Sequence, residues 1–262
     1  MLKYFNIHNE DCLITMEKLK NSIDLIVTSP PYNMTSRPGG NADSGRYDVY
    51  TDWKTETEYI EWTENIFNNF NKILKENSVI LYNFSYSIEN PSLPYKLVAS
   101  IEKDTDFALV DTIIWKKSTG MPFPANKYRL SRNWEFIWVF VRKSEINTFN
   151  IHKGISKISE KTGQKYYNIF YNMIDSVNSD YPTPTLNQAT YSSDMVLKLF
   201  DIYCNDGYTV YDPFNGTGTT GYACKISRLK DLTYIGSEIS KNQCEYSIKR
   251  IQNETEISID SF

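Results

Sequence analysis

The chain has 262 residues, of which 40% are hydrophobic, so it is long enough for one large α/β domain with an insertion or for two small domains. Its sequence contains no run of eighteen apolar residues and no signal-peptide core near the first residue, and we therefore expect a cytoplasmic protein without a membrane span. The formal net charge of −4 argues against a uniformly basic nucleic-acid-binding protein.

The first part of the chain alternates between strand and helix patterns. The apolar spacing predicts strands over 2–7, 23–28 and 78–84 and helices over 11–19, 57–75 and 91–103. Residues 34–53 hold Pro38 and three glycines and show little periodicity. We predict a long polar loop there, as expected of a lid or a disordered segment.

The second part resumes the alternation after an irregular stretch. Strands are predicted over 107–115, 134–141, 208–211 and 232–236, and helices over 193–204, from the glycine-rich turn to about 227, and over 241–251. Alternating strands and helices indicate an α/β fold with a doubly wound, mostly parallel sheet. Residues 143–189 lack periodicity and are interpreted as a small inserted recognition region, which leaves 1–142 and 190–262 as the main domain.

The corner after the strand over 23–28 reads Thr28-Ser29-Pro30-Pro31-Tyr32-Asn33. Because proline has no N–H group and a fixed φ, the two prolines must end the strand abruptly and leave a rigid turn at its carboxyl end. The Ser29 hydroxyl and a proline carbonyl can accept the two hydrogens of an amino group, while the Tyr32 ring offers a stacking surface. The corner therefore suits a planar base that carries an amino group; the alternative is an ordinary turn that ends a strand.

A glycine-rich turn runs from Asp212 to Gly221 between a predicted strand and a predicted helix. Its glycines let the backbone approach a ligand, and the helix N-terminus favours an anionic group such as a carboxylate. Glu238 ends the next strand, where an acid can accept hydrogen bonds from ribose hydroxyls. The turn is also compatible with a nicotinamide dinucleotide, although four residues separate the strand from the first glycine. A Walker phosphate loop is excluded because Tyr222-Ala223 follows the last glycine.

Basic residues gather in two stretches. Between 115 and 132 there are five bases and no acid, and between 142 and 165 six bases accompany two acids. The stretches indicate either a surface for phosphates or ordinary solvated loops. The four cysteines form no Cys-x-x-Cys pair and neither histidine lies near one, so we expect no metal site and no disulfide framework.

Four segments resemble the motifs of the DNA amino-methyltransferases. Ser29-Pro30-Pro31-Tyr32 is similar to their catalytic motif, and the stretch 212–220 to their S-adenosylmethionine motif. The stretch 234–240, followed by a helix, resembles their ribose-binding segment, and Asp11-Cys12-Leu13 the segment that contacts the cofactor adenine. The catalytic motif precedes the cofactor motif, which is the order of the β class. About four fifths of the chain are covered, all except 143–190, and residues 187–192 depart from the family's usual His-Pro-Ala segment.

This resemblance implies a Rossmann-like methyltransferase fold, S-adenosylmethionine as cofactor and double-stranded DNA as partner. It assigns catalytic roles to Ser29, Pro30, Pro31 and Tyr32, and cofactor binding to Asp11, Asp212, Phe214, Gly216, Gly218, Thr219, Thr220 and Glu238. The first basic stretch adds candidate DNA contacts at Lys116, Lys117, Lys127, Arg129 and Arg132. A restriction-modification system is implied, and a partner endonuclease and a homodimer stay open.

The expected reaction is methylation of the exocyclic N4 amine of cytosine in a base flipped out of the duplex. Adenine enzymes of the family mostly carry Asp or Asn at the position of Ser29, whereas cytosine-N4 enzymes mostly carry Ser. A serine hydroxyl could accept from the amine and donate to the neighbouring ring nitrogen. Methylation at cytosine carbon 5 is excluded because no cysteine follows a proline. The alternatives are an adenine-N6 enzyme, a methyltransferase for RNA or a protein amide, and a catalytically silent DNA-binding subunit.

Overall fold

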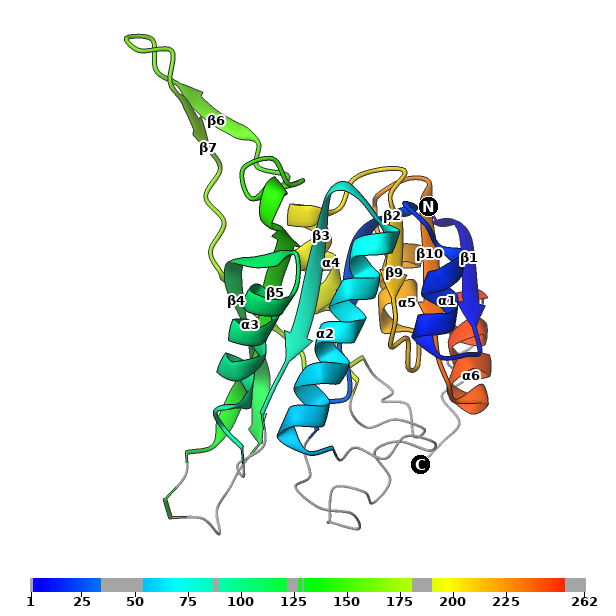
Figure 1. The fold of residues 1–262 in the computed structure, drawn as a ribbon. Coiled ribbons are helices and arrows are strands. Elements are labelled where there is room, and N and C mark those ends of the chain that lie inside the picture. Colours follow the sequence, from blue (N-terminus) through cyan, green and yellow to red (C-terminus); the bar gives the residue numbers. More distant parts are fainter. Residues whose placement is uncertain are drawn as a thin grey trace.

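A twisted sheet with helices on both faces organises the molecule (Figure 1). The computed structural model describes residues 2–33, 54–86, 90–121, 127–128, 130–180 and 190–252. Within these residues, the strand order in the main sheet is β1 (Leu2–His8), β10 (Leu232–Ser237), β9 (Thr209–Asp212), β2 (Ile23–Thr28), β3 (Leu74–Phe84), β5 (Arg132–Arg142), β4 (Phe107–Met121) and β8 (Met173–Ser176). Only β5 among them runs antiparallel to its neighbours, which confirms the predicted doubly wound, mostly parallel sheet.

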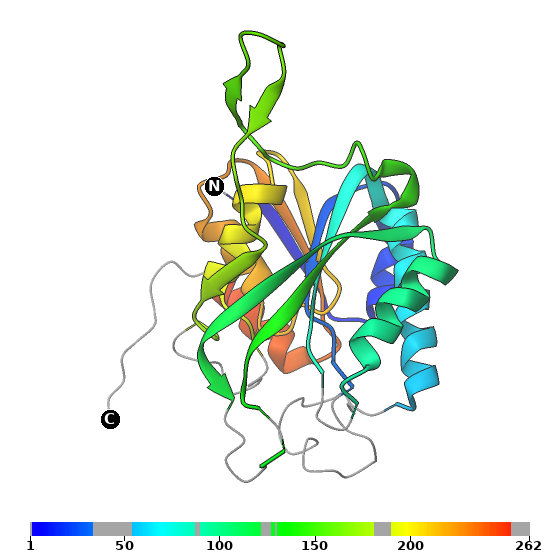
Figure 2. The ribbon, with the colours of Figure 1, turned by 90° about the vertical axis from the view of Figure 1, so that its left-hand side faces the viewer.

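Two groups of helices cover the two faces of this sheet. One face carries α1 (Cys12–Lys18), α2 (Glu56–Ile73) and α3 (Leu93–Asp104), and the other carries α4 (Ser193–Tyr203), α5 (Thr219–Ile226) and α6 (Lys241–Gln252). Figure 2 shows the sheet edge-on between them. In α2 the buried residues recur at helical spacing, as at Ile66, Phe70 and Ile73, so burial of one apolar stripe holds the helix against the sheet. A capping box between Thr55 and Glu58 fixes its start.

Two predicted strands are longer than expected. Leu74 already pairs with Ile23, so the chain enters β3 directly from the last turn of α2, whereas the sequence predicts a helix to 75 and a strand only from 78. Strand β4 continues to Met121 because its polar end still pairs with β5 and β8. In both cases the tertiary pairing overrides a weak local strand signal.

The sheet changes its winding direction between β9 and β2. These strands are parallel neighbours, with Leu25 opposite Val210 and Ile26 opposite Tyr211. The chain leaves β9 through α5 toward β10 on one side, and leaves β2 through α2 toward β3 on the other. Open α/β sheets bind ligands outside the carboxyl ends of the strands at such a switch point. Both sequence motifs follow these two strands.

The stretch predicted as an insertion divides into two parts. Strands β6 (Ile155–Ile158) and β7 (Lys165–Tyr167) form a separate hairpin that projects from the molecule (Figures 1 and 2), whereas β8 returns to the main sheet beside β4. The 3-10 turn Lys143–Glu145 precedes the hairpin. The recognition role of 143–189 stays a prediction, and residues 181–189 and the predicted loop over 34–53 lie outside the described residues.

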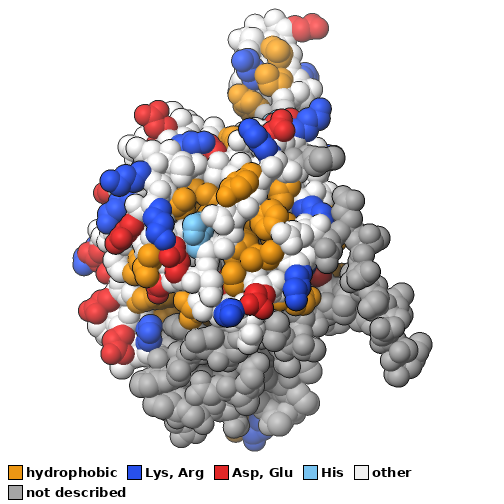
Figure 3. Space-filling model, turned by 90° about the vertical axis from the view of Figure 1, so that its right-hand side faces the viewer, with side chains coloured by type: hydrophobic (Ala, Val, Ile, Leu, Met, Phe, Trp, Pro, Cys, Tyr) orange, Lys and Arg blue, Asp and Glu red, His pale blue; other side chains and the backbone are white. Residues whose placement is uncertain are grey.

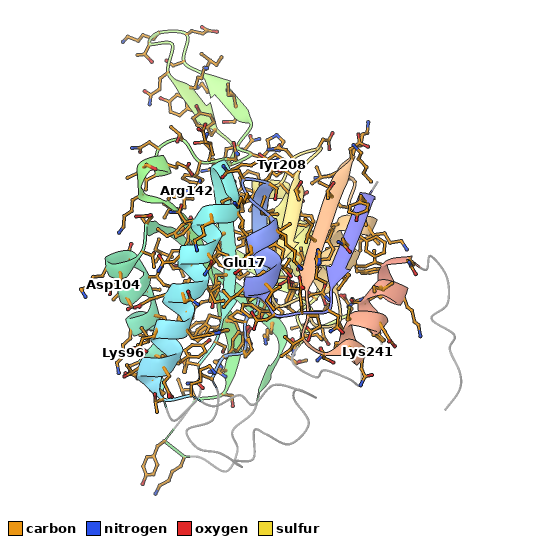
Figure 4. All side chains as sticks on the ribbon, turned by 45° about the vertical axis from the view of Figure 1, so that its right-hand side comes forward. Glu17, Lys96, Asp104, Arg142, Tyr208 and Lys241 are labelled. Atoms are coloured by element: carbon orange, nitrogen blue, oxygen red, sulfur yellow. The ribbon has the colours of Figure 1, made fainter. Side chains whose placement is uncertain are left out.

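The hairpin lies at the amino-terminal edge of the parallel strands. Strand β5 runs antiparallel to β3 and ends at Arg142, which donates hydrogen bonds to the backbone carbonyls of Leu74 and Lys75 where β3 begins. Figure 4 shows Arg142 at the same edge as Tyr208, just before β9, and Lys241, which opens α6, at the opposite edge. The hairpin therefore projects away from the carboxyl ends of the strands.

No helix of the described residues is long and apolar enough to cross a membrane.

Candidate functional site

The corner after β2 is held from two sides. The Tyr59 hydroxyl on α2 donates to the carbonyl of Pro31 at 2.6 Å, and the Thr28 hydroxyl donates to Oδ1 of Asp212 at 2.7 Å. Pro30 is buried and Ser29 is half-buried. The corner is therefore rigid because the prolines restrict its backbone and hydrogen bonds fix both flanks.

The side chains of Ser29 and Tyr32 join a polar network where β3 ends and β5 begins. The Tyr32 hydroxyl lies 2.7 Å from the Ser29 hydroxyl, 2.8 Å from Oδ1 of Asn83 and 3.2 Å from Oε2 of Glu135. The Tyr32 ring packs against Phe84 with ring centroids 5.1 Å apart. Asn83 and Glu135 were not predicted, because each belongs to an apolar strand pattern in which a single polar residue carries no signal.

Asp212 is a buried connector beneath the cleft and does not line it. Its carboxylate accepts hydrogen bonds from the Thr28 hydroxyl, the Tyr191 hydroxyl at 2.9 Å, the Thr220 hydroxyl at 3.1 Å and the backbone N–H of Phe214 at 3.0 Å. Burial raises the pKa of this carboxyl above its ordinary value, and these hydrogen bonds oppose the rise. Asp212 thus joins β2, β9 and α5 from within.

The glycine turn has left-handed backbone at Gly216 (φ 50°) and Gly218 (φ 80°). A Cβ atom at position 218 would lie 2.7 Å from the Cβ of Ser247 on α6. Gly218 therefore serves the packing of α6 against the turn. Helix α5 begins at the next residue, Thr219.

Glu238 follows β10 and accepts a hydrogen bond from this turn. Its Oε2 accepts a hydrogen bond from the backbone N–H of Gly216 at 2.7 Å, and its Oε1 accepts one from Ser240 at 2.8 Å. An ionised carboxylate has about four acceptor positions. An acidic side chain after a strand in this type of fold is suited to accept hydrogen bonds from the hydroxyls of a sugar.

The corner and the glycine turn meet on one open cleft with an empty volume of about 1030 Å³. The predicted site residues that line it are Asp11, Ser29, Pro30, Pro31, Tyr32, Phe214, Gly216, Thr219 and Glu238. Three predicted cofactor residues do not line the cleft, namely Asp212, Gly218 and Thr220. They are buried behind its wall and support the glycine turn. One cleft can thus hold two reactants side by side.

Several lining residues were missed from the sequence. Trp62 packs against Phe214 with ring centroids 5.5 Å apart, but its helical spacing in α2 looks like that of a core residue. Thr190 and Thr217 line the cleft, and their buried hydroxyls have no hydrogen-bond partner among the described residues. Buried hydroxyls without partners favour a polar ligand in the cleft. Together with the acid and the helix terminus they fit the sugar and the charged methionine end of S-adenosylmethionine.

The candidate DNA-binding residues differ in their surroundings. Lys116 pairs with Asp175 at 3.0 Å and Lys117 with Glu135 at 2.5 Å, so the local excess of bases is partly compensated by acids from other strands. Arg132 donates to the carbonyl of Tyr86 and lies 4.5 Å from its ring. Lys127 is exposed, and Arg129 lies outside the described residues.

Lys117 lies at the cleft edge of the sheet, because Glu135 contacts both Lys117 and Tyr32. On the face that carries β1 and α1, basic and acidic side chains of the described residues are interspersed (Figure 3). The described residues form no extended basic area on that face. Within the described ranges, no group of three or more His, Cys, Asp and Glu residues could hold a metal ion, and all four cysteines are buried free thiols.

Comparison with known proteins finds curated and structural relatives. The type II methyltransferase M.MwoI of Methanothermobacter wolfeii is 31% identical over 235 residues, which cover 84% of this chain and 30% of the relative. The chain thus spans about a third of that relative's length. The cytosine-N4-specific PvuII DNA methyltransferase has the same fold with a TM-score of 0.73 at 18% identity, covering 97% of this chain and 89% of that one.

A second solved structure is the complex of M1.HpyAVI with S-adenosylmethionine, with a TM-score of 0.62 at 21% identity over 94% of this chain and 99% of that one. The model of the N6/N4 DNA methylase family matches residues 23–249. This match includes the proline corner, the glycine turn and everything between them, so the chain belongs to the N6/N4 DNA methylase family, whose cofactor is S-adenosylmethionine.

Proposed function

We propose that this chain transfers a methyl group from S-adenosylmethionine to the exocyclic N4 amine of cytosine at specific sites in double-stranded DNA. The observation that carries the proposal is the serine at the first position of the proline corner, with its hydroxyl on the wall of the cleft. Ser29 matches the residue that cytosine-N4 enzymes of the family mostly carry. Support also comes from the PvuII enzyme, which is cytosine-N4-specific and shares the fold.

The corner would activate the amine by accepting its hydrogens. An exocyclic amine is a poor nucleophile because its lone pair is delocalised into the ring. Hydrogen bonds to the Ser29 oxygen and the Pro30 carbonyl would favour a more tetrahedral nitrogen whose lone pair can attack. The carbonyl of Pro31 already accepts from Tyr59, so Pro30 is the better acceptor for the amine.

The base would reach the corner by leaving the duplex, with the Tyr32 ring as its stacking surface. When bound, S-adenosylmethionine supplies an electrophilic methyl group on a sulfonium. Glu238 would hold the ribose hydroxyls, Asp11 would lie at the adenine, and Thr190, Thr217 and the start of α5 would take the charged methionine end. The chain thus acts chiefly by positioning and by fixed dipoles.

DNA would lie along the cleft edge beside Lys117. The candidate contacts of the first basic stretch are Lys116, Lys117, Lys127, Arg129 and Arg132. The second basic stretch belongs to the other edge of the sheet, so we do not include it in this contact. Because M.MwoI is a type II methyltransferase, a restriction endonuclease with the same recognition sequence is the proposed partner. A homodimer stays a prediction.

Methylation of adenine N6 is the second candidate, because the family includes enzymes for both amines and the corner can accept from either. The test is to express the chain in cells without DNA methylation, digest their DNA to nucleosides and measure these by mass spectrometry. We expect N4-methylcytosine in the wild type and none in Ser29→Ala. N6-methyladenine without N4-methylcytosine would replace the first candidate by the second, and no methylated nucleoside would favour a silent subunit.

A further inference from the structure

A carboxylate that no motif of the sequence contains lies behind the catalytic corner. We propose that Glu135 is a positioning residue for methyl transfer: through the Tyr32 hydroxyl it makes the Ser29 hydroxyl donate away from the cleft and leaves the Ser29 oxygen as a pure acceptor for the target amine. The proposal rests on the function proposed above only in that an exocyclic amine is the methyl acceptor.

The contacts form one chain of hydrogen bonds across four elements. Lys117 on β4 lies 2.5 Å from Oε1 of Glu135 on β5. Oε2 of Glu135 lies 3.2 Å from the Tyr32 hydroxyl, which lies 2.7 Å from the Ser29 hydroxyl. Asn83 on β3 contributes its Oδ1 at 2.8 Å from the same phenol.

The direction of these hydrogen bonds follows from counting protons. Asn83 donates through Nδ2 to the carbonyl of Phe136 at 2.9 Å, so the atom it turns toward Tyr32 is an acceptor. The Glu135 carboxylate, paired with the Lys117 ammonium, is an acceptor as well. A phenol carries one proton, and the two acceptors that face it require that proton to point at them.

The short contact between Tyr32 and Ser29 must then be made by the serine proton. If Ser29 were the acceptor, the phenol proton would point at Ser29. The oxygens of Asn83 and Glu135, at 2.8 and 3.2 Å from the phenol oxygen, would then receive no proton from it. Buried acceptors without a donor are costly. The Ser29 hydroxyl therefore donates to Tyr32, and its lone pairs remain to accept from a ligand in the cleft.

Burial makes this chain of hydrogen bonds effective. The exposed fractions of the Glu135 and Lys117 side chains are 12% and 23%, so water screens the charge of Glu135 only partly. Linked hydrogen bonds polarise one another in such surroundings. The negative charge of Glu135 draws the phenol proton, the phenol oxygen becomes a better acceptor, and the Ser29 oxygen becomes more basic toward the amine.

This direction changes one expectation from the sequence. A free serine hydroxyl could also donate to the ring nitrogen beside the cytosine amine, but here its proton is already committed to Tyr32. Ser29 can then serve the amine of cytosine or adenine alike. Discrimination between the two bases would have to come from other groups around the cleft.

The test compares two carboxylate-to-amide variants in single-turnover methyl transfer with saturating DNA and cofactor. Glu135→Gln should lower the rate constant about tenfold, as expected when a charge-assisted hydrogen bond becomes a neutral one, with unchanged dissociation constants for both reactants. The control is Asp24→Asn. Asp24 is 14% exposed and pairs with Lys75 at 2.7 Å, but it lies where β2 begins, at the other end of the strand from Ser29. Its replacement should leave the rate unchanged.

Tyr32→Phe separates positioning from a structural role, because it removes the hydroxyl and keeps the ring. In the Tyr32→Phe background, Glu135→Gln should cause no further decrease in rate. A decrease equal to that in the wild-type background would overturn the proposal, and so would a Glu135→Gln rate equal to that of Asp24→Asn. The comparison works for either methylated amine.

A second measurement does not depend on activity. With 3-fluorotyrosine incorporated at position 32, the ¹⁹F resonance reports the hydrogen bonds of the phenol. Glu135→Gln should shift this resonance and Asp24→Asn should not. If the wild type methylates no amine but the resonance shifts, the proposed function fails and the hydrogen-bond chain stands; an unshifted resonance refutes the chain itself.

Discussion

Thr28 and Asp212 are 184 positions apart, and the hydroxyl of the first donates to the carboxylate of the second at 2.7 Å. Thr28 ends β2 and Asp212 ends β9, so this hydrogen bond joins the strand before the proline corner to the strand before the glycine turn. Tyr191 and Thr220 donate to the same carboxylate. The two halves of the cleft are therefore held in register by one buried acid.

Replacing this acid should weaken the fold before it affects any ligand contact. Asp212→Ala leaves three hydroxyl donors and one N–H without their acceptor, and we expect a decrease of about 3 kcal/mol in the free energy of unfolding. Urea denaturation measures it. A decrease below about 0.5 kcal/mol, the usual range of surface substitutions, would show that the connector is dispensable.

The pH dependence of stability gives a second check on Asp212, through Asp212→Asn. Because burial raises the pKa of the folded state above its ordinary value of 3.8, Asp212 contributes stability that is complete below that value and is lost as the pH rises through the folded pKa. The advantage of the wild type over Asp212→Asn should therefore shrink as the pH rises above about 4. An advantage that grows with pH would contradict the raised pKa.

Gly218 offers a prediction with an internal control. Gly218→Ala adds a Cβ at 2.7 Å from Ser247 and strains a φ of +80°, so it should cost about 2–3 kcal/mol of stability. Gly207→Ala has nearly the same φ, +77°, with nothing within 4 Å of its Cβ, and should cost only the backbone part, about 1 kcal/mol. Ser247→Gly should recover most of the difference. Equal destabilisation at both glycines would remove the packing explanation.

Cofactor affinity should depend on Glu238. Glu238→Ala removes the proposed acceptor for the ribose hydroxyls and the acceptor of the Gly216 N–H, so S-adenosylmethionine binding should weaken by roughly 1–3 kcal/mol. Glu245→Ala is a control on α6, where Glu245 pairs with Lys241 at 3.8 Å and does not line the cleft. Titration calorimetry compares the two, and unchanged affinity in a folded Glu238→Ala protein would discard this assignment.

Local sequence patterns were sufficient to predict most helices and strands and to locate both motifs. Ile23-Asp24-Leu25-Ile26-Val27 predicts a buried parallel strand because that environment needs a nearly continuous apolar run, and Pro30 ends it through its own covalent geometry. The same reasoning located the glycine turn. In these places the physical cause lies within a few residues of its effect.

Partners that meet only through the fold could not be predicted in this way. Lys117 is an uncompensated base in its own stretch, yet β5 brings Glu135 to within 2.5 Å of it. Asp212 is predicted to bind the cofactor because it belongs to the stretch that resembles the family's S-adenosylmethionine motif. Its side chain is instead buried against Thr28 at the end of β2 and against Tyr191, and neither contact is visible in the sequence. The edge at which the hairpin projects depends on the antiparallel direction of β5, which no periodicity shows.

The direction of β5 leads to the last prediction, on DNA binding. Lys116, Lys117 and Arg132 of the first basic stretch lie at the edge of the sheet that carries the corner, and the hairpin lysines lie at the other edge. Replacing Lys116, Lys127 and Arg129 by Gln should reduce the slope of log K against log salt by about 0.9 for each phosphate that the protein no longer neutralises. Replacing Lys153, Lys157 and Lys161 by Gln removes the same charge from exposed positions near the hairpin and should leave the slope unchanged. The net charge of both variants is equal, so a general electrostatic effect would move both slopes alike. A slope that changes only in the hairpin variant would reverse the assignment and move the DNA to the amino-terminal edge of the sheet.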